Sequence, residues 1–184
     1  MSSTSPSAAS HATAAKTDGF AMLDACHRDT VVALDTLKAL AARLKQGGVD
    51  AQARELAAQV LTFFSTTSRQ HHEDEERHVF PKLLASGDAD IMQAVQRLQL
   101  DHSWIDADWH ELAPQIDALA GGQTWPDVDI LAEGVEIFVA LSLDHMALEE
   151  SYIYPEARTR LRAAERGAMG REMAARRHAK RRAA

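Results

Sequence analysis

Cysteine is almost absent from this chain, and several classes of protein are thereby excluded. Among 184 residues Cys26 is the only cysteine, so neither an internal disulfide nor a cysteine-ligated zinc finger can form. Long apolar runs are also missing, because no stretch approaches the roughly 18 consecutive apolar residues of a membrane-spanning helix. Residues 1–18 lack the apolar core of a signal peptide, and we expect them to form a disordered leader. These absences favour a cytoplasmic protein.

Proline and aromatic residues are also scarce, with five prolines and 5% aromatics, whereas alanine and leucine lead a hydrophobic content of 46%. This composition favours helices over strands. Hydrophobic periodicity and glycine-rich breaks predict four long helices and a shorter fifth, over residues 19–46, 51–85, 89–120, 127–160 and 163–182. Helices joined by short turns pack as antiparallel neighbours. The prediction is an all-α protein, with an up-down-up-down four-helix bundle in residues 19–160 and a basic C-terminal helix or tail in residues 161–184.

The net charge of −7 is unevenly distributed along the chain. The segment from Glu156 onward holds ten Lys or Arg and three Glu, so it carries about +7 and the preceding part about −14. No aromatic residue interleaves the basic segment, and no groove-reading motif precedes it, so neither nucleic acid nor a membrane is the expected partner. We expect this segment to pack on the acidic bundle, and docking of a protein partner remains an alternative.

Two windows of the chain, residues 64–81 and 138–155, match without gaps at an offset of 74 residues. The identical pairs are Phe64/Phe138, Ser68/Ser142, His71/His145, Glu75/Glu149, Glu76/Glu150 and Pro81/Pro155. His27 and His102 are separated by nearly the same offset, 75 residues. The chain therefore reads as two related helical hairpins, each with one early histidine and one later His-x-x-x-Glu.

Helix lengths place all four of these histidines at one level. His27 lies 19 residues before the end of its helix, and His71 lies 21 residues after the next break, which is about 30 Å in both cases. Similar counts bring His102 and His145 to the same height, on apolar, inward stripes. Glu75 and Glu149 follow their histidines by one turn on the same face. Burying these two carboxylates as ions is costly unless a cation compensates, so a metal site is predicted.

Imidazole and carboxylate ligands suit iron, manganese or zinc. Two glutamates that face each other can each bridge two metals, and each metal then takes two histidines, which favours a non-haem di-iron centre over a single zinc. The ordered pattern His27 … His71-x-x-x-Glu75 … His102 … His145-x-x-x-Glu149 resembles the hemerythrin-like family of HHE cation-binding domains, over residues 19–160. The resemblance implies two oxo- or hydroxo-bridged irons that bind O2 or NO, in a sensor, carrier or stress-defence protein. Its alternatives are an enzyme that turns over peroxide or NO, and a protein of iron handling or iron–sulfur repair.

Some residues admit two interpretations. Oxygen-carrying hemerythrins are similar but have a second histidine one turn after the residue matching His102; here that residue is Asp106, an additional candidate ligand. His72 has the same spacing to Glu76 as His71 has to Glu75, and the repeat favours His71. A ferritin-like centre would require a second Glu-x-x-His motif, which the chain lacks. His78 and Tyr152, seven residues after the two motif histidines, are expected to lie beside the metals or to pack at the bundle end.

Overall fold

The computed structural model describes residues 18–183, so the expected leader lies, apart from Asp18, outside the described part. These residues are helical, which confirms the predicted all-α class. The elements are α2 (Gly19–Gly47), α3 (Ala51–Thr62), the π-helix η1 (Phe63–Ser68), α4 (Arg69–His78), α5 (Phe80–Leu84), α6 (Ala89–Ala120), α7 (Val128–Leu148), the π-helix η2 (Glu149–Ile153), α8 (Tyr154–Arg160) and α9 (Ala163–Ala183). Within residues 18–183, no helix is both long and apolar enough to cross a membrane.

Aspartates begin the four long helical segments. Asp18, Asp50, Asp88 and Asp127 each precede a helix, and each side chain accepts hydrogen bonds from backbone N–H groups of the first turn. Such caps satisfy donors that the helix itself cannot, and a negative charge also suits the positive end of the helix dipole. The sequence thus fixes where each long segment starts.

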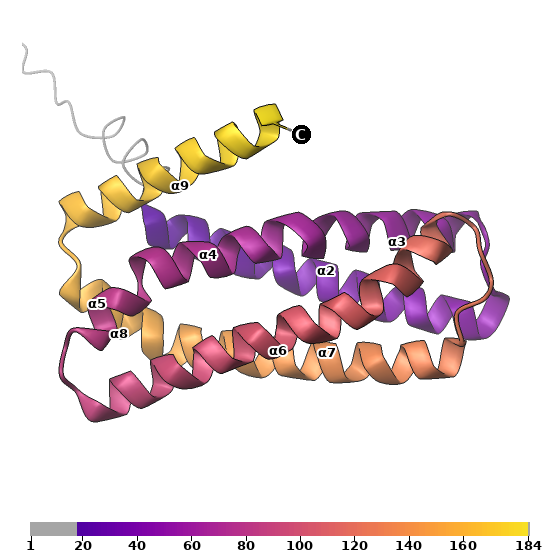
Figure 1. The fold of residues 1–184 in the computed structure, drawn as a ribbon, viewed down its shortest axis with the longest axis horizontal. Coiled ribbons are helices and arrows are strands. Elements are labelled where there is room, and N and C mark those ends of the chain that lie inside the picture. The colour runs from indigo at the N-terminus through magenta and orange to yellow at the C-terminus, as the bar shows by residue number, and fades with distance from the viewer. Residues whose placement is uncertain (1–17, 184) are drawn as a thin grey trace, which may run out of the picture.

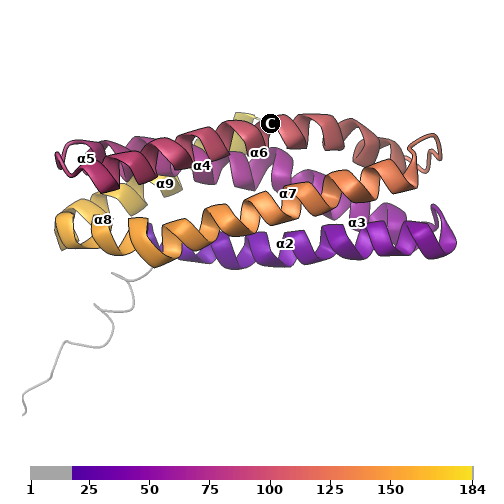
Figure 2. The same ribbon diagram turned by 90° about the horizontal axis from the view of Figure 1, so that it is seen from below.

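The long segments lie side by side (Figures 1 and 2). α2 packs against α3 and α7, and α6 packs against the same two helices. Two predicted helices are chains of shorter elements, because residues 51–84 run as α3–η1–α4–α5 and residues 128–160 run as α7–η2–α8. Pro81 and Pro155 each lie at the start of the last element of these chains. Proline lacks the N–H that would continue the helical hydrogen bonding, which accounts for the interruptions nearby.

The apolar core has two parts, which we call the Phe64 cluster and the Phe20 cluster. The Phe64 cluster includes Phe64, Trp109 and Phe138, and the Phe20 cluster includes Phe20, Phe80 and Tyr154. Along each of the four long segments, residues of one cluster are followed by buried polar residues and then by the other cluster. A polar layer therefore separates two hydrophobic cores.

The basic helix α9 packs on α2 and α4 (Figure 1). Its Met169 and Met173 are buried in the Phe20 cluster. Arg176 and Arg177 both pair with Asp74, which is fully buried beside the polar layer. Charge complementarity between α9 and the acidic body thus accompanies its apolar contact.

Candidate metal centre

The polar layer gathers the six residues that the sequence pattern singled out. Each is at most 4% exposed, and they come from four segments of the chain. The members are His27 of α2, His71 and Glu75 of α4, His102 of α6, His145 of α7 and Glu149 of η2. Their donor atoms form two overlapping groups, one with His27 and His71 and the other with His102 and His145, and both groups contain Glu75 and Glu149.

The two glutamates divide their oxygens between the histidine pairs. Oε1 of Glu75 lies 3.4 Å from Nε2 of His71, and Oε2 lies 3.4 Å from Nε2 of His102. Oε2 of Glu149 lies 3.1 Å from Nε2 of His27, and Oε1 lies 3.2 Å from Nε2 of His145. Each carboxylate thus offers one oxygen to each half of the centre, which is the arrangement of a ligand that bridges two cations.

Several buried polar atoms of this layer have no hydrogen-bond partner in the described part of the chain. Among them are Nε2 of His102 and His145, Oε2 of Glu75 and both oxygens of Glu149. Buried polar groups are normally hydrogen-bonded, because an unsatisfied one costs about 1–3 kcal/mol and a charged one more. These atoms point at one another across the layer, and imidazole nitrogen with carboxylate oxygen is a ligand set for divalent transition metals. The residues therefore fit a metal centre.

The protonation of the carboxylates explains why a cation suits this layer. Burial, followed by the charge of Glu149, raises the pKa of Glu75. Burial also disfavours the ionised form of Glu149, but His145 and His27 outweigh it and hold the pKa of Glu149 well below its ordinary value. Burial lowers the pKa of His71 well below its ordinary value, which keeps the ring neutral and able to bind a metal. Without a cation, the layer therefore favours ionisation of Glu149 over that of Glu75. A bound cation would favour ionisation of both carboxylates.

Carboxylates orient two of the four rings from outside. Nδ1 of His27 lies 2.9 Å from Oε1 of Glu150, and Nδ1 of His102 lies 2.9 Å from Oε1 of Glu76. Nδ1 of His145 lies 3.7 Å from Oδ2 of Asp101, which is too far for a hydrogen bond, and neither atom has a hydrogen-bond partner in residues 18–183. A partner on Nδ1 fixes the tautomer that leaves Nε2 free for a metal and raises the basicity of the ring. Glu76 and Glu150, which are equivalent in the repeat, thus act alike on the two halves.

Tyr154 lies in the layer although sequence reasoning did not single it out. Its hydroxyl donates to Oε1 of Glu75 and is 3.1 Å from Nε2 of His27, and its ring stacks on His27 with centroids 5.2 Å apart. Phe80, its equivalent in the repeat, stacks on His102 in the same way, with centroids 5.5 Å apart. The repeat pairs these two positions, but Phe80 has no polar group, so the repeat gives no signal for the hydroxyl of Tyr154.

Three residues named from the sequence lie away from the layer. Asp106 is exposed and belongs to neither group of candidate ligands. Nε2 of His78 lies 2.6 Å from Oε2 of Glu172 in α9. Tyr152 is partly exposed and packs at the edge of the Phe20 cluster. Tyr152 thus takes the second of its two expected places, at the bundle end, and His78 pairs with α9, while Tyr154 lies in the layer itself.

His72 was considered as a rival of His71, and the structure brings both histidines to the layer. His71 faces Glu75, as the repeat predicted, whereas the ring of His72 stacks on that of His102 with centroids 4.0 Å apart. His72 also lines a small cavity against the layer, together with His71, His145, Phe64 and Met146. That cavity has about 10 Å³ for the centre of a water-sized molecule, which is room for roughly one such molecule.

The comparisons with known proteins agree with this geometry. An uncharacterized protein of Haemophilus influenzae is 29% identical to this chain over 159 residues, which are 86% of this chain and 90% of that protein. The family model of the hemerythrin HHE cation-binding domain matches residues 18–157, which include all six residues of the polar layer. The chain therefore belongs to the hemerythrin HHE cation-binding domain family.

Proposed function

We propose that this protein is a hemerythrin-like, up-down-up-down four-helix bundle of residues 19–160 that holds two non-haem iron ions and binds a small diatomic ligand, O2 or NO. A basic C-terminal helix or tail in residues 161–184 completes it. The bundle topology is supported by the short turns and by the packing of each long segment against two neighbours. The proposed ligands are His27, His71, Glu75, His102, His145 and Glu149.

The single observation that carries this proposal is the division of each glutamate's oxygens between the two histidine pairs. One cation would need only one such pair, whereas two cations side by side explain why both carboxylates face both halves. The four histidines would be terminal ligands and the two glutamates would be bridges.

The donor set favours iron. Two imidazoles with carboxylate oxygens, and positions left open for exchangeable ligands, are typical of non-haem iron sites that react with O2. A structural zinc site is usually closed by four ligands, commonly with cysteine. The bound irons would supply reversible redox chemistry and a place for the diatomic ligand, while the protein orients the rings and keeps bulk water out.

The cavity beside His71 and His145 supports a small ligand. Its remaining walls are largely apolar, and its size suits a diatomic molecule or one water. Met146, which lines it, has a flexible side chain that can move to admit a ligand.

Anaerobic titration of metal-free protein with Fe(II), followed by elemental analysis, tests the metal part. We expect about two irons per chain for the wild type. Glu149→Gln should bind iron more weakly, whereas Glu136→Gln, an exposed glutamate of the same helical segment, should behave as the wild type. One tightly bound zinc per chain, or no bound metal, would contradict the proposal.

The ligand part is tested by adding O2 or NO to the iron-loaded protein. A binding protein takes up a stoichiometric amount and stops, whereas an enzyme continues to consume its substrate. Uptake that ends at about one ligand per centre supports the proposal, and sustained turnover of NO or peroxide supports the enzymatic alternative.

A further inference from the structure

Helix α9 covers the seam between α2 and α4, the helices that carry His27 and His71 (Figure 1). α9 packs on both of them, whereas α2 and α4 are not among the pairs of described elements that pack closely on each other. Elsewhere around the bundle the helices meet directly, since α7 packs on both α2 and α6. The seam between α2 and α4 is therefore closed by α9.

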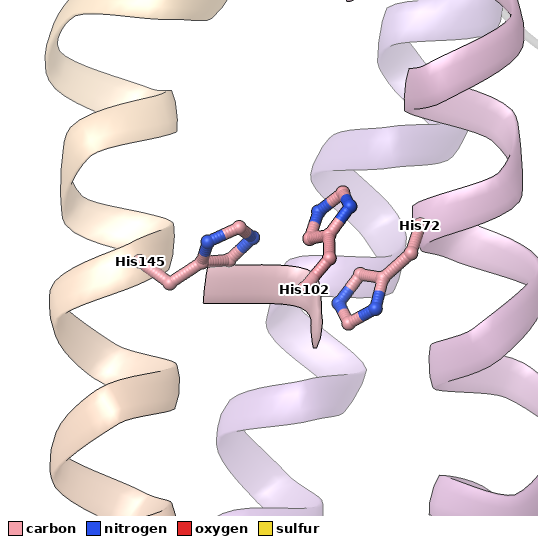
Figure 3. A group of neighbouring side chains, drawn as sticks. All are labelled: His72, His102 and His145. Atoms are coloured by element: carbon pink, nitrogen blue, oxygen red, sulfur yellow. The ribbon is translucent and has the colours of Figure 1, made fainter. Parts of the chain in front are cut away.

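Side chains fill the other sides of the polar layer. His72, His102 and His145 come from α4, α6 and α7, and their rings turn toward one another (Figure 3). The ring of His72 stacks on that of His102, and Glu76 occupies Nδ1 of His102 from outside. Glu150 occupies Nδ1 of His27 at the seam between η2 and α2. An ion that entered on these sides would have to displace packed rings or their partners.

Ion pairs are the main anchors of α9 over its seam. Among its described side chains, the apolar Met169 and Met173 are buried in the Phe20 cluster. The innermost ion pairs join Arg176 and Arg177 to the fully buried Asp74. Residues 161–162 alone connect α9 to α8, and the backbone is extended at the first of them. An element with so few buried apolar contacts is one that can open locally while the rest of the fold persists.

Two acidic residues face α9 directly before Glu75 in the sequence. Asp74 pairs with two arginines of α9, and Glu73 pairs with Lys180 at 2.7 Å. These cationic side chains neutralise both acids while the helix is in place. When α9 lifts, the two carboxylates lose their partners, and the seam then attracts a divalent cation toward the layer.

We propose that α9 is a hinged cover of the metal centre, and that iron enters the polar layer between α2 and α4 while α9 is lifted. The inference rests on the proposed two-iron function and adds the route by which its buried ligands are reached. Entry and release follow the same route, so the opening of α9 sets both rates and leaves the affinity for iron unchanged.

Cys26 can report the opening of α9 independently of iron. Gly19 lies against Met169 of α9, because a Cβ added at Gly19 would collide with the methionine side chain. Cys26 follows Gly19 by seven residues and returns to nearly the same face of α2. Its side chain is buried, which raises the pKa of the thiol to about 12 against the opposing charge of Arg177. As the single cysteine of the chain, it should react with the thiol reagent DTNB when α9 lifts.

Two variants loosen α9 by different means. Met173→Ala removes a fully buried side chain of α9, and Gly19→Ala displaces Met169 without changing α9 itself. The matched control is Leu119→Ala, because it removes a side chain buried in the Phe64 cluster, on a helix that is not among the close packing neighbours of α9. Far-UV circular dichroism establishes that each variant is folded. The readouts are the rates of anaerobic Fe(II) uptake, of iron release to a chelator, and of DTNB labelling of the metal-free protein.

We expect Met173→Ala to accelerate labelling, iron uptake and iron release by the same factor. That factor should be at least about 10-fold, because loss of a buried methionine side chain costs more free energy than a tenfold change in population. Gly19→Ala should accelerate the three rates together, whereas Leu119→Ala should match the wild type. The number of bound irons and their affinity should be the same in all four proteins.

Three results would overturn the inference while leaving the two-iron proposal intact. Faster labelling of Cys26 with unchanged iron uptake would mean that α9 opens but iron enters elsewhere. Equal acceleration of uptake in Leu119→Ala would mean that entry follows general loss of stability. Unchanged rates in both folded α9 variants would mean that α9 does not control access at all. A wild type that binds fewer than two irons would instead overturn the proposed function, and this inference with it.

Discussion

Tyr154 and Phe80 stack on equivalent histidines of the two hairpins and differ by one hydroxyl group. That hydroxyl donates to Glu75, whose carboxylate is fully buried. Burial raises the pKa of Tyr154 well above its ordinary value, so the hydroxyl keeps its proton and remains a donor. A single oxygen atom therefore distinguishes the surroundings of His27 from those of His102.

Replacing Tyr154 by phenylalanine should destabilise the metal-free protein. The buried Glu75 oxygen then loses its donor, which costs about 1–3 kcal/mol, so the free energy of unfolding in urea should fall by that amount. Tyr152→Phe, at a partly exposed tyrosine two residues earlier, should change it by less than about 0.5 kcal/mol. Equal effects of the two substitutions would show that the Tyr154 hydroxyl has no special role.

Residues of the polar layer could be predicted from the sequence where they recur in both hairpins. The register of the repeat selected His71, Glu75, His145 and Glu149, because identical residues recur at the same offset. Tyr154 and His72 were not selected, because Phe80 and Met146 replace them in the other half. A repeat reveals what two halves share and is silent about what only one of them has.

At the scale of elements, the π-helices displace side chains from the positions that an ideal α-helix predicts. Tyr152 follows His145 by seven residues and should return to the same face, yet Tyr154 faces the layer. The wider turn of η2, over Glu149–Ile153, changes the angular phase after Glu149. Hydrophobic periodicity gives the existence and approximate ends of a helix but not such a local change of winding, so it could not decide between the two places expected for Tyr152.

Two arginines of helix α9 pair with a buried aspartate of the bundle. Asp74 has no exposed surface and pairs with Arg176 and Arg177. The double substitution Arg176→Met with Arg177→Met would leave this buried charge unpaired, which typically costs about 3–5 kcal/mol, and urea denaturation should show a loss of that order.

Adding Asp74→Asn to the double variant should recover part of the loss, because it removes the unpaired charge. Arg171→Met, at an exposed position of the same helix, should leave the midpoint nearly unchanged. Equal losses in the double variant and in Arg171→Met would mean that apolar contacts alone hold α9.

Acid should loosen the same helix. The guanidinium of Arg176 lowers the pKa of Glu172 to about 2, from an ordinary value of 4.5. A carboxyl whose pKa is lower in the folded than in the unfolded protein stabilises the fold at pH values above its unfolded-state pKa. That stabilisation is lost as the pH falls from about 4.5 to about 2. We expect the wild type to have a higher urea midpoint than Glu172→Gln near neutral pH. This difference should disappear as the pH falls through that window. A difference in urea midpoint that stays constant over the whole range would refute this.

At the scale of the whole molecule, the polar layer lies between two hydrophobic cores, and each of the four long segments contributes residues to both cores. A metal that binds the folded layer but not the unfolded chain stabilises the protein by about 2.7 kcal/mol at a free concentration 100 times the dissociation constant. Thermal unfolding of the wild type should therefore shift upward on addition of Fe(II) under anaerobic conditions.

Glu149→Gln should lose most of this shift, because it removes a donor that faces both halves of the layer. Glu136→Gln should retain the full shift, since it lies on the exposed surface of α7. An unchanged metal-dependent shift in Glu149→Gln would show that the stabilising metal binds elsewhere.

The two hairpins surround the layer as two copies of one protein would surround a symmetric dimer interface, with Glu76 and Glu150, or Phe80 and Tyr154, in corresponding places. Because the two hairpins belong to one chain, they can diverge in a way that the two copies of a homodimer cannot. In a homodimer every mutation appears twice, so both sides of the interface must remain the same. In this chain each side can mutate alone, and a donor gained by one hairpin need not be imposed on the other.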